Sequence, residues 1–229
     1  MKTVNGISEL IFQIIYFVIL TSAFVFGAVK LFGKSSPMYF RLYVMACGCL
    51  MLESLISGVL LICRLDDGNI TAAFFFGTFS FSLFILSANR GTLDGIVDER
   101  GERKNRRARI YAFAAPVIIA SLAAAAALGI GKSSPVQGIL LFAAISPTVF
   151  ASYYNLKHLL LPVDDIGFLK ATRGCNIAAL AYEISDTVFI MLSAAFPNSP
   201  AVMIYGAAVY AAAALLVIAA VRGYEKWEI

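Results

Sequence analysis

The chain has few charged residues, and this scarcity indicates its class. Asp, Glu, Lys and Arg make up 14% of the 229 residues, whereas 60% are hydrophobic. The mean hydropathy is +0.84. A soluble domain carries about a quarter charged and about half apolar residues. The composition therefore excludes an ordinary soluble domain and predicts a protein embedded in a lipid bilayer.

Histidine and cysteine are also scarce, which leaves little material for metal or redox chemistry. His158 is the single histidine, and no Cys-x-x-Cys motif occurs. One histidine cannot complete a zinc or haem site with these cysteines. We therefore expect no cofactor and interpret the cysteines as small packing residues. They are Cys47, Cys49, Cys63 and Cys175.

Long apolar runs take up most of the chain. A membrane-spanning helix requires about 20 mostly apolar residues. Seven stretches meet this length and predict an all-α integral membrane protein of seven transmembrane helices, with no segment left for a soluble domain. The first stretch is too long for a signal-peptide core, so we expect it to remain in the mature protein. The stretches are 8–32, 39–63, 70–90, 109–130, 136–160, 174–196 and 201–221.

Basic residues are concentrated on one side of the predicted bundle. Only Lys2, Arg64 and Lys132, three of the 18 basic residues, fall on the opposite side. Cytoplasmic loops are enriched in Lys and Arg, so the pattern predicts an external N-terminus and a cytoplasmic C-terminus, in the plasma membrane. Tyr39 and Tyr43 are then expected at the cytoplasmic membrane interface. The net charge of +4 reflects topology, and we expect no nucleic-acid partner.

Two glutamates at matching places suggest an internal duplication. Glu53 in the second span and Glu183 in the sixth are 130 residues apart, and Arg90 and Arg222, at the ends of the third and seventh spans, are 132 apart. This offset predicts a parallel repeat of three helices, a linker helix and three helices. The alternative is that the arginines reflect topology only. Within the single membrane domain 1–229, the halves would be 1–92 and 133–229, joined by a basic loop and linker helix at 93–132.

Three carboxylates in the middle of predicted spans are the strongest indication of function. They are Glu53 in the second span and Glu183 and Asp186 in the sixth. An ionisable group at bilayer depth costs on the order of 3 kcal/mol or more. Glu183 and Asp186 are three residues apart and share a helix face. Glu53 is predicted at a depth close to that of Asp186, so we expect all three to meet at the midplane.

No Lys or Arg occupies the same depth, so the three carboxylates cannot all be charged at low cost. We expect at least one to hold a proton that an entering cation would displace, which is the basis of proton-coupled exchange. The alternative is that protonated carboxyls form hydrogen bonds between helices, worth about 1 kcal/mol each. Further residues expected to bind the substrate or ion are Asn176, Tyr182, Ser146, Thr148 and Tyr154.

These features predict a membrane transporter or channel-like carrier for a small solute or cation. We do not expect an enzyme, because no Ser/His, zinc or HExxH arrangement accompanies the carboxylates. The alternative is a seven-helix sensor or receptor-like module that signals through a separate cytoplasmic partner. Loop 93–109 mixes acidic and basic residues, and it would contact that partner or anionic lipid. The sequence predicts no particular oligomeric state.

The predicted outline resembles two known families. The three-one-three arrangement is similar to that of sugar and amino-acid carriers with PQ-loop repeats, but Pro147 is not followed by Gln. A seven-helix bundle with an external N-terminus resembles microbial rhodopsins, whose last helix carries a mid-span lysine for retinal. Here the last span has no lysine before Lys226. The resemblance therefore extends to architecture and not to function.

Overall fold

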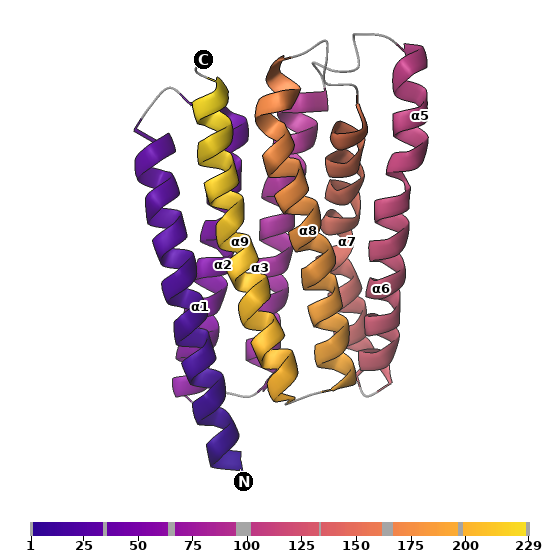
Figure 1. Cartoon of the computed structure of the whole chain (residues 1–229). Coiled ribbons are helices and arrows are strands. Elements are labelled where there is room, and N and C mark those ends of the chain that lie inside the picture. Colours follow the sequence, from indigo (N-terminus) through magenta and orange to yellow (C-terminus); the bar gives the residue numbers. More distant parts are fainter. Residues whose placement is uncertain are drawn as a thin grey trace.

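The protein is a bundle of long helices that run along one axis (Figure 1). The computed structural model describes residues 2–33, 36–63, 67–94, 102–132, 134–161, 167–196 and 199–227. Every regular element in these ranges is helical, so the predicted all-α class is confirmed. The elements are α1 (Lys2–Leu31), α2 (Met38–Ile62), α3 (Asp67–Ala88), a π-helical turn η1 (Asn89–Asp94), α5 (Glu102–Ala112), α6 (Ala114–Gly131), α7 (Pro135–Leu160), α8 (Gly167–Ala195) and α9 (Pro200–Trp227).

Six helical segments among the described residues are long and apolar enough to cross a bilayer. They correspond to the first, second and fourth to seventh predicted stretches, which supports a multi-pass membrane protein. The helix at the third stretch, α3, packs along α2 and α7 but is not one of the six. A seventh span and the internal repeat stay predictions. The six segments are Glu9–Leu31, Met38–Ile62, Arg106–Gly131, Pro135–Leu160, Lys170–Ser193 and Pro200–Trp227.

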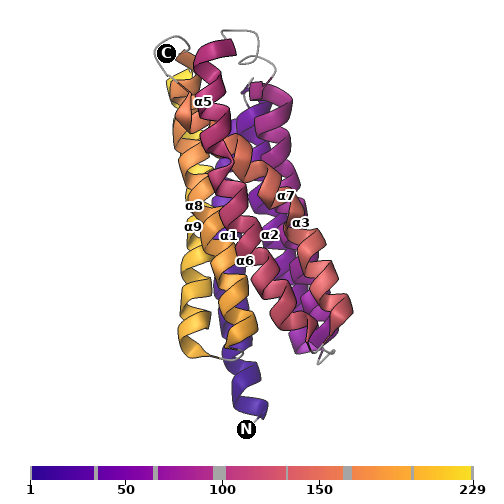
Figure 2. The ribbon, with the colours of Figure 1, turned by 90° about the vertical axis from the view of Figure 1, so that its right-hand side faces the viewer.

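The two termini lie at opposite ends of the bundle (Figure 1). We call these the N-terminal end and the C-terminal end. Termini at opposite ends agree with the predicted odd number of crossings. Figure 2, viewed from the side of α5 and α6, shows these two helices following one another along the bundle axis. A turn at Phe113 separates them, and together they supply the segment Arg106–Gly131, which corresponds to the fourth predicted stretch.

Serine and proline mark where helices begin. At the start of α7, the Ser134 hydroxyl accepts a hydrogen bond from the backbone N–H of Gln137 at 3.5 Å, and Pro135 occupies the first turn. Both are favoured at helix N-termini because they suit the N–H groups that lack a helical partner. The same residue types occur at the start of α9, where Ser199 precedes the helix and Pro200 is its first residue.

Pro147 lies inside α7, where it cannot donate the backbone hydrogen bond that would reach the carbonyl of Ala143. The neighbouring Ser146 hydroxyl donates to that carbonyl instead, at 2.8 Å. A side-chain hydrogen bond thus replaces the missing helical bond to this carbonyl. The replacement is needed because lipid hydrocarbon offers no hydrogen-bond donor.

The distribution of side chains is that of a membrane bundle, with apolar residues on the outside and polar residues within. Large apolar side chains such as Val29, Leu128 and Ile139 are more than 70% exposed. A soluble protein rarely leaves contiguous apolar surface of this kind uncovered. α2 packs against α1, α3 and α9 and lies in the middle of the bundle. The candidate functional residues lie on and around it.

Candidate functional site

Glu53 of α2 is buried near the middle of the bundle, at 2% exposure. Its Oε1 accepts a hydrogen bond from the Ser57 hydroxyl at 3.3 Å, and its Oε2 accepts one from the Tyr210 hydroxyl of α9 at 3.0 Å. Gly77 of α3 lies directly against it. A Cβ at Gly77 would overlap the side-chain carbons of Glu53. The carboxylate therefore fits only because residue 77 has no side chain.

Asp186 of α8 lies close enough to Glu53 for their charges to interact. We call Glu53 and Asp186 the central carboxylate pair. Asp186 is buried, at 6% exposure, and makes no ion pair or hydrogen bond with a residue that the structure describes. Its oxygens are therefore available to a ligand or to water, since buried polar groups generally have a partner.

Tyr182 connects the three carboxylates that the sequence singled out. It is buried on α8 and lies within electrostatic range of Glu53, Glu183 and Asp186. Its ring packs on Phe81 of α3, with centroids 4.6 Å apart. Like Asp186, it makes no hydrogen bond to a described residue. The hydroxyl is thus a second polar group available for binding beside the central carboxylate pair.

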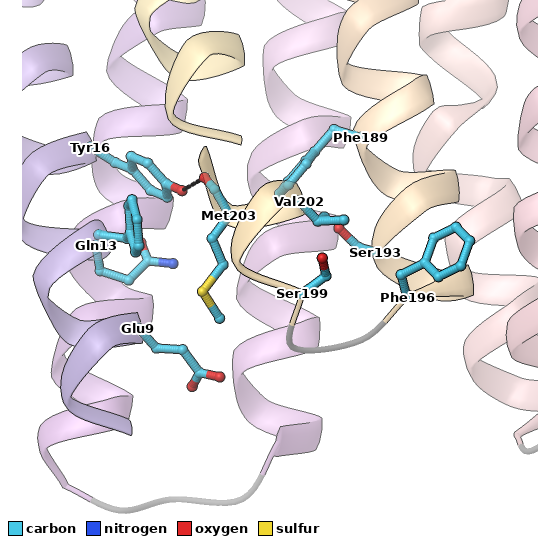
Figure 3. A pocket seen from close by; sticks show the side chains of 10 residues that line it. Glu9, Gln13, Tyr16, Phe189, Ser193, Phe196, Ser199, Val202 and Met203 are labelled. Carbon is cyan, nitrogen blue, oxygen red and sulfur yellow. Dashed lines mark hydrogen bonds between the residues drawn. The ribbon is translucent and has the colours of Figure 1, made fainter. Parts of the chain in front are cut away.

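A pocket opens at the N-terminal end of the bundle, between α1, α8 and α9 (Figure 3). Its volume is about 180 Å³. Glu9 and Gln13 lie along α1, and Tyr16 and Phe189 are the lining residues farthest into the bundle on α1 and α8. The Tyr16 hydroxyl donates to the backbone carbonyl of Met203 at 3.1 Å, as Figure 3 shows. Aromatic rings and a carboxylate are the groups that bind small organic cations.

Two tyrosines separate this pocket from the central carboxylate pair. The ring of Tyr16 stacks on that of Tyr210, with centroids 4.3 Å apart and planes 14° apart. Tyr210 in turn donates its hydroxyl hydrogen to Glu53. The pocket, the stacked tyrosines and Glu53 therefore form one continuous series of contacts.

A second polar group surrounds Glu183, toward the C-terminal end. Asn155 of α7 donates to Glu183 Oε1 at 2.9 Å, and Asn89 donates to Asn155 Oδ1 at 2.8 Å. Asn89 begins the π-helical turn, a type of local distortion that often occurs at functional sites. Its Oδ1 lies 3.2 Å from Nδ1 of His158. Four polar side chains from three elements thus meet in the interior.

Tyr43 and Tyr39 extend this group to Asn176. Asn89 donates to the Tyr43 hydroxyl at 3.4 Å, the Tyr43 and Tyr39 hydroxyls are 3.0 Å apart, and Tyr39 donates to Asn176 Oδ1 at 3.1 Å. Both tyrosines are almost fully buried, so their rings face the bundle interior and not lipid, and their depth at the membrane interface stays a prediction. They face inward because α2 is covered on several sides. We call the set Glu183, Asn155, Asn89, His158, Tyr43, Tyr39 and Asn176 the inner network.

The buried acceptor Glu183 Oε2 and the buried donor Asn176 Nδ2, both in the inner network, have no hydrogen-bond partner among the described residues. An unsatisfied buried polar atom costs about 1–3 kcal/mol and requires an explanation. One open acceptor and one open donor in the same network would suit bound water or a small polar ligand.

The predicted site residues thus fall into three sets. Glu53, Asp186 and Tyr182 lie together, whereas Glu183 and Asn176 belong to the inner network. The three carboxylates occupy two neighbouring groups, and among the residues described no three His, Cys, Asp or Glu are placed to hold a metal ion.

The remaining predicted residues, Ser146, Thr148 and Tyr154, make no hydrogen bond to either group. Ser146 bonds its own helix at Ala143. The Thr148 hydroxyl lies 2.6 Å from that of Ser82, a bond between α7 and α3. Tyr154 is half-buried, and its ring lies 5.7 Å from Nζ of Lys157.

Several residues of the candidate site were not predicted from the sequence. Tyr16 and Tyr210 form the stacked pair, and Gly77 makes room for Glu53. Asn89 and Asn155 are the centre of the inner network. An asparagine inside an apolar span is a signal that the sequence offers, but a glycine or tyrosine there is common and indicates no particular role.

The site thus consists of a pocket, a central carboxylate pair behind two stacked tyrosines, and an inner network of amides and hydroxyls. All three lie among helices α1, α2, α3, α7, α8 and α9, with α5 and α6 to one side. No family model, curated protein or solved structure matches the chain.

Proposed function

We propose that the protein is a seven-helix membrane transporter for a small solute or cation, coupled to protons through the central carboxylate pair. The observation that carries this proposal is the series of polar groups along the bundle axis, from the pocket through Glu53 and Asp186 to the inner network. Polar groups at membrane depth are expensive and commonly mark the path of a substrate or ion.

The order of residues along α8 supports such a path. Phe189 lines the pocket, Asp186 belongs to the central carboxylate pair, and Glu183 and Asn176 belong to the inner network. At 1.5 Å per residue, the distance along the helix from Phe189 to Asn176 is about 20 Å, or roughly two thirds of the hydrocarbon thickness. A single helix therefore contributes, one after another along its axis, residues of the pocket, the central carboxylate pair and the inner network.

The central carboxylate pair supplies the coupling. Neither Glu53 nor Asp186 forms an ion pair with any Lys or Arg that the structure describes. Two buried carboxylates whose charges interact cannot both be charged at low cost, so one holds a proton until a cation enters. Exchange of a proton for a cationic solute follows directly. Tyr182 and Asp186 supply the hydrogen-bonding groups that no described side chain uses.

The stacked tyrosines form the barrier in this scheme. Tyr16 and Tyr210 lie between the pocket and Glu53. A solute that enters the pocket reaches the central carboxylate pair only after the two rings separate. A conformational step of this kind is a normal part of alternating access.

The test is uptake into vesicles that contain the purified protein. A panel of small inorganic and organic cations is offered with and without a pH gradient, and internal pH is followed with a trapped dye. We expect at least one cation to move protons outward, and Glu53→Gln and Asp186→Asn each to abolish this flux. Glu225→Gln, which removes an exposed carboxylate on α9, is the matched control and should transport normally.

Flux that persists in both carboxylate variants would contradict coupling through the central carboxylate pair. If no cation moves protons in the parent protein, the sensor hypothesis is favoured, and its predicted contact is loop 93–109. Residues 95–101 of this loop lie outside the described residues, and α5 begins at Glu102. No observation on the described part of the loop favours that function over transport.

A further inference from the structure

A groove between α8 and α9 at the C-terminal end has the chemistry of a phospholipid site. Its volume is about 330 Å³. Three basic residues line it, namely Lys170 of α8 and Arg222 and Lys226 of α9. We propose that this groove binds an anionic phospholipid from the bilayer leaflet at the C-terminal end. The proposal does not depend on the transport function, because the groove lies outside the polar path.

The three basic groups are available to a ligand. Lys170, Arg222 and Lys226 are all exposed, and none forms an ion pair or hydrogen bond with a described residue. Arg222 and Lys226 are four residues apart on α9 and therefore share one face. Among the described residues, none of those that line the groove is acidic. Glu225 lines the neighbouring groove between α1 and α9, which Arg222 also borders. A concentration of unpaired positive charge favours an anionic group such as a phosphate.

The deeper part of the groove is apolar. Leu215 and Ile218 of α9 line it at 57% and 37% exposure, and Gly174 lines it from α8. A Cβ at Gly174 would meet nothing within 4 Å, so this glycine leaves open space rather than a close helix contact. From Leu215 to Lys226 the groove follows α9 for about 16 Å. That length is suited to part of an acyl chain below a headgroup.

The combination selects a phospholipid over a soluble anion. A free phosphate would use only the basic end, whereas a phospholipid uses the basic end for its headgroup and the apolar part for a chain. Basic pockets between membrane helices on the cytoplasmic side bind anionic headgroups, and each Lys or Arg near the surface strengthens the attraction about fivefold. The C-terminal end is the predicted cytoplasmic end, where anionic lipids are concentrated.

The single tryptophan of the chain gives a direct measurement. Trp227 follows Lys226 at the end of α9. Its fluorescence is measured while brominated phosphatidylglycerol, or brominated phosphatidylcholine with the same chains, is added to the full-length protein in neutral detergent. We expect saturable quenching with phosphatidylglycerol at concentrations at least about tenfold lower than with phosphatidylcholine.

Two triple variants separate a specific site from general charge attraction. Lys170→Gln/Arg222→Gln/Lys226→Gln should lose the preference for phosphatidylglycerol. The control Lys30→Gln/Arg90→Gln/Arg107→Gln removes the same charge from exposed residues outside the groove and should keep it. Equal preference in both variants, or equal loss in both, would overturn the proposal.

Gly174→Leu tests the acyl-chain part of the groove with the charges intact. The new side chain should occupy the groove and weaken quenching by phosphatidylglycerol several-fold, with unchanged folding because its Cβ has room. Unchanged lipid binding in this variant, or full competition by millimolar inorganic phosphate, would mean a site for soluble anions and would refute a lipid site.

Discussion

At the scale of single residues, the position of Glu53 depends on the glycine that faces it. The side-chain carbons of Glu53 occupy the space that a Cβ at Gly77 would take. We expect Gly77→Ala to displace the carboxylate and to lower the free energy of unfolding by about 1–3 kcal/mol, as overpacking of a core does. Equilibrium unfolding in mixed micelles measures this change.

Gly129→Ala is the control for the helix propensity of alanine. Gly129 lies on α6, and a Cβ there would meet nothing within 4 Å. Alanine is a better helix former than glycine by about 1 kcal/mol, so this variant should be as stable as the parent or more so. Equal effects of the two substitutions would show that Gly77 is not matched to Glu53.

Tyr210 is the partner that satisfies one oxygen of Glu53. Tyr210→Phe removes the hydroxyl that lies 3.0 Å from Glu53 Oε2 and leaves a buried oxygen without a donor. We expect a loss of about 1–3 kcal/mol in stability. Tyr205→Phe, which deletes the bond from the half-buried Tyr205 to the backbone carbonyl of Ser185, should cost less.

A double-mutant cycle shows whether the Tyr210 effect acts through Glu53. In a Glu53→Leu background the carboxylate is absent, so Tyr210→Phe should cost much less than it does in the parent protein. If the cost of Tyr210→Phe is the same in both backgrounds, the hydroxyl has another role and the assigned contact is not responsible.

At the scale of single helices, α7 shows how a proline is accommodated inside a span. Pro147 frees the carbonyl of Ala143, and the Ser146 hydroxyl binds it. We expect Ser146→Ala to cost about 1 kcal/mol in the parent protein, because it leaves that carbonyl without a donor. In a Pro147→Ala background the backbone N–H returns, and the same substitution should cost almost nothing. Unfolding in mixed micelles measures both.

Ser121→Ala on α6 provides the comparison for this cycle. Its hydroxyl also bonds a backbone carbonyl, that of Val117, at 2.7 Å. No proline interrupts the helix there, so that carbonyl keeps its helical partner and the loss should be smaller. An equal loss of stability in the two serine variants would mean that the Ser146 bond does not compensate for the proline at position 147.

The helices were the part of the molecule that the sequence predicted best. Apolar runs of about 20 residues predict spans because each backbone group in hydrocarbon needs an internal partner. The six segments long enough to cross the bilayer overlap six of the predicted stretches. Helix ends were predicted less well, since α8 begins at Gly167 and α9 continues to Trp227, beyond the apolar stretches.

The candidate site was only partly predictable, because contacts between distant helices depend on rotation about each helix axis. Carboxylates in apolar spans are a composition signal, and the charges of Glu53 and Asp186 interact in the structure. Tyr39 and Tyr43 lie near a predicted span end, which is typical of rings at the membrane interface. In the structure both rings face inward and belong to the inner network. Which face of α2 is covered depends on three neighbouring helices, and the sequence of α2 does not contain that information.

At the scale of the whole molecule, the distribution of polar groups places function in the interior and lipid contact on the surface. The polar path lies among α1, α2, α3, α7, α8 and α9, whereas α5 and α6 lie beside it. The exposed apolar residues face outward on these same helices. The two termini lie at opposite ends of the bundle, so the membrane orientation is open to a direct test.

The native cysteines allow this test with little change to the protein. Cys63 is exposed at the N-terminal end, at the end of α2, whereas Cys47 and Cys175 are buried and Cys49 is half-buried. With the N-terminal end outside, a membrane-impermeant maleimide should label intact cells at Cys63, and Cys63→Ser should abolish this labelling. In a Cys63→Ser background, a cysteine introduced by Arg90→Cys, near the C-terminal end, should react only after the membrane is permeabilised. The reverse pattern would place the basic end outside, against the distribution of Lys and Arg that predicts the orientation.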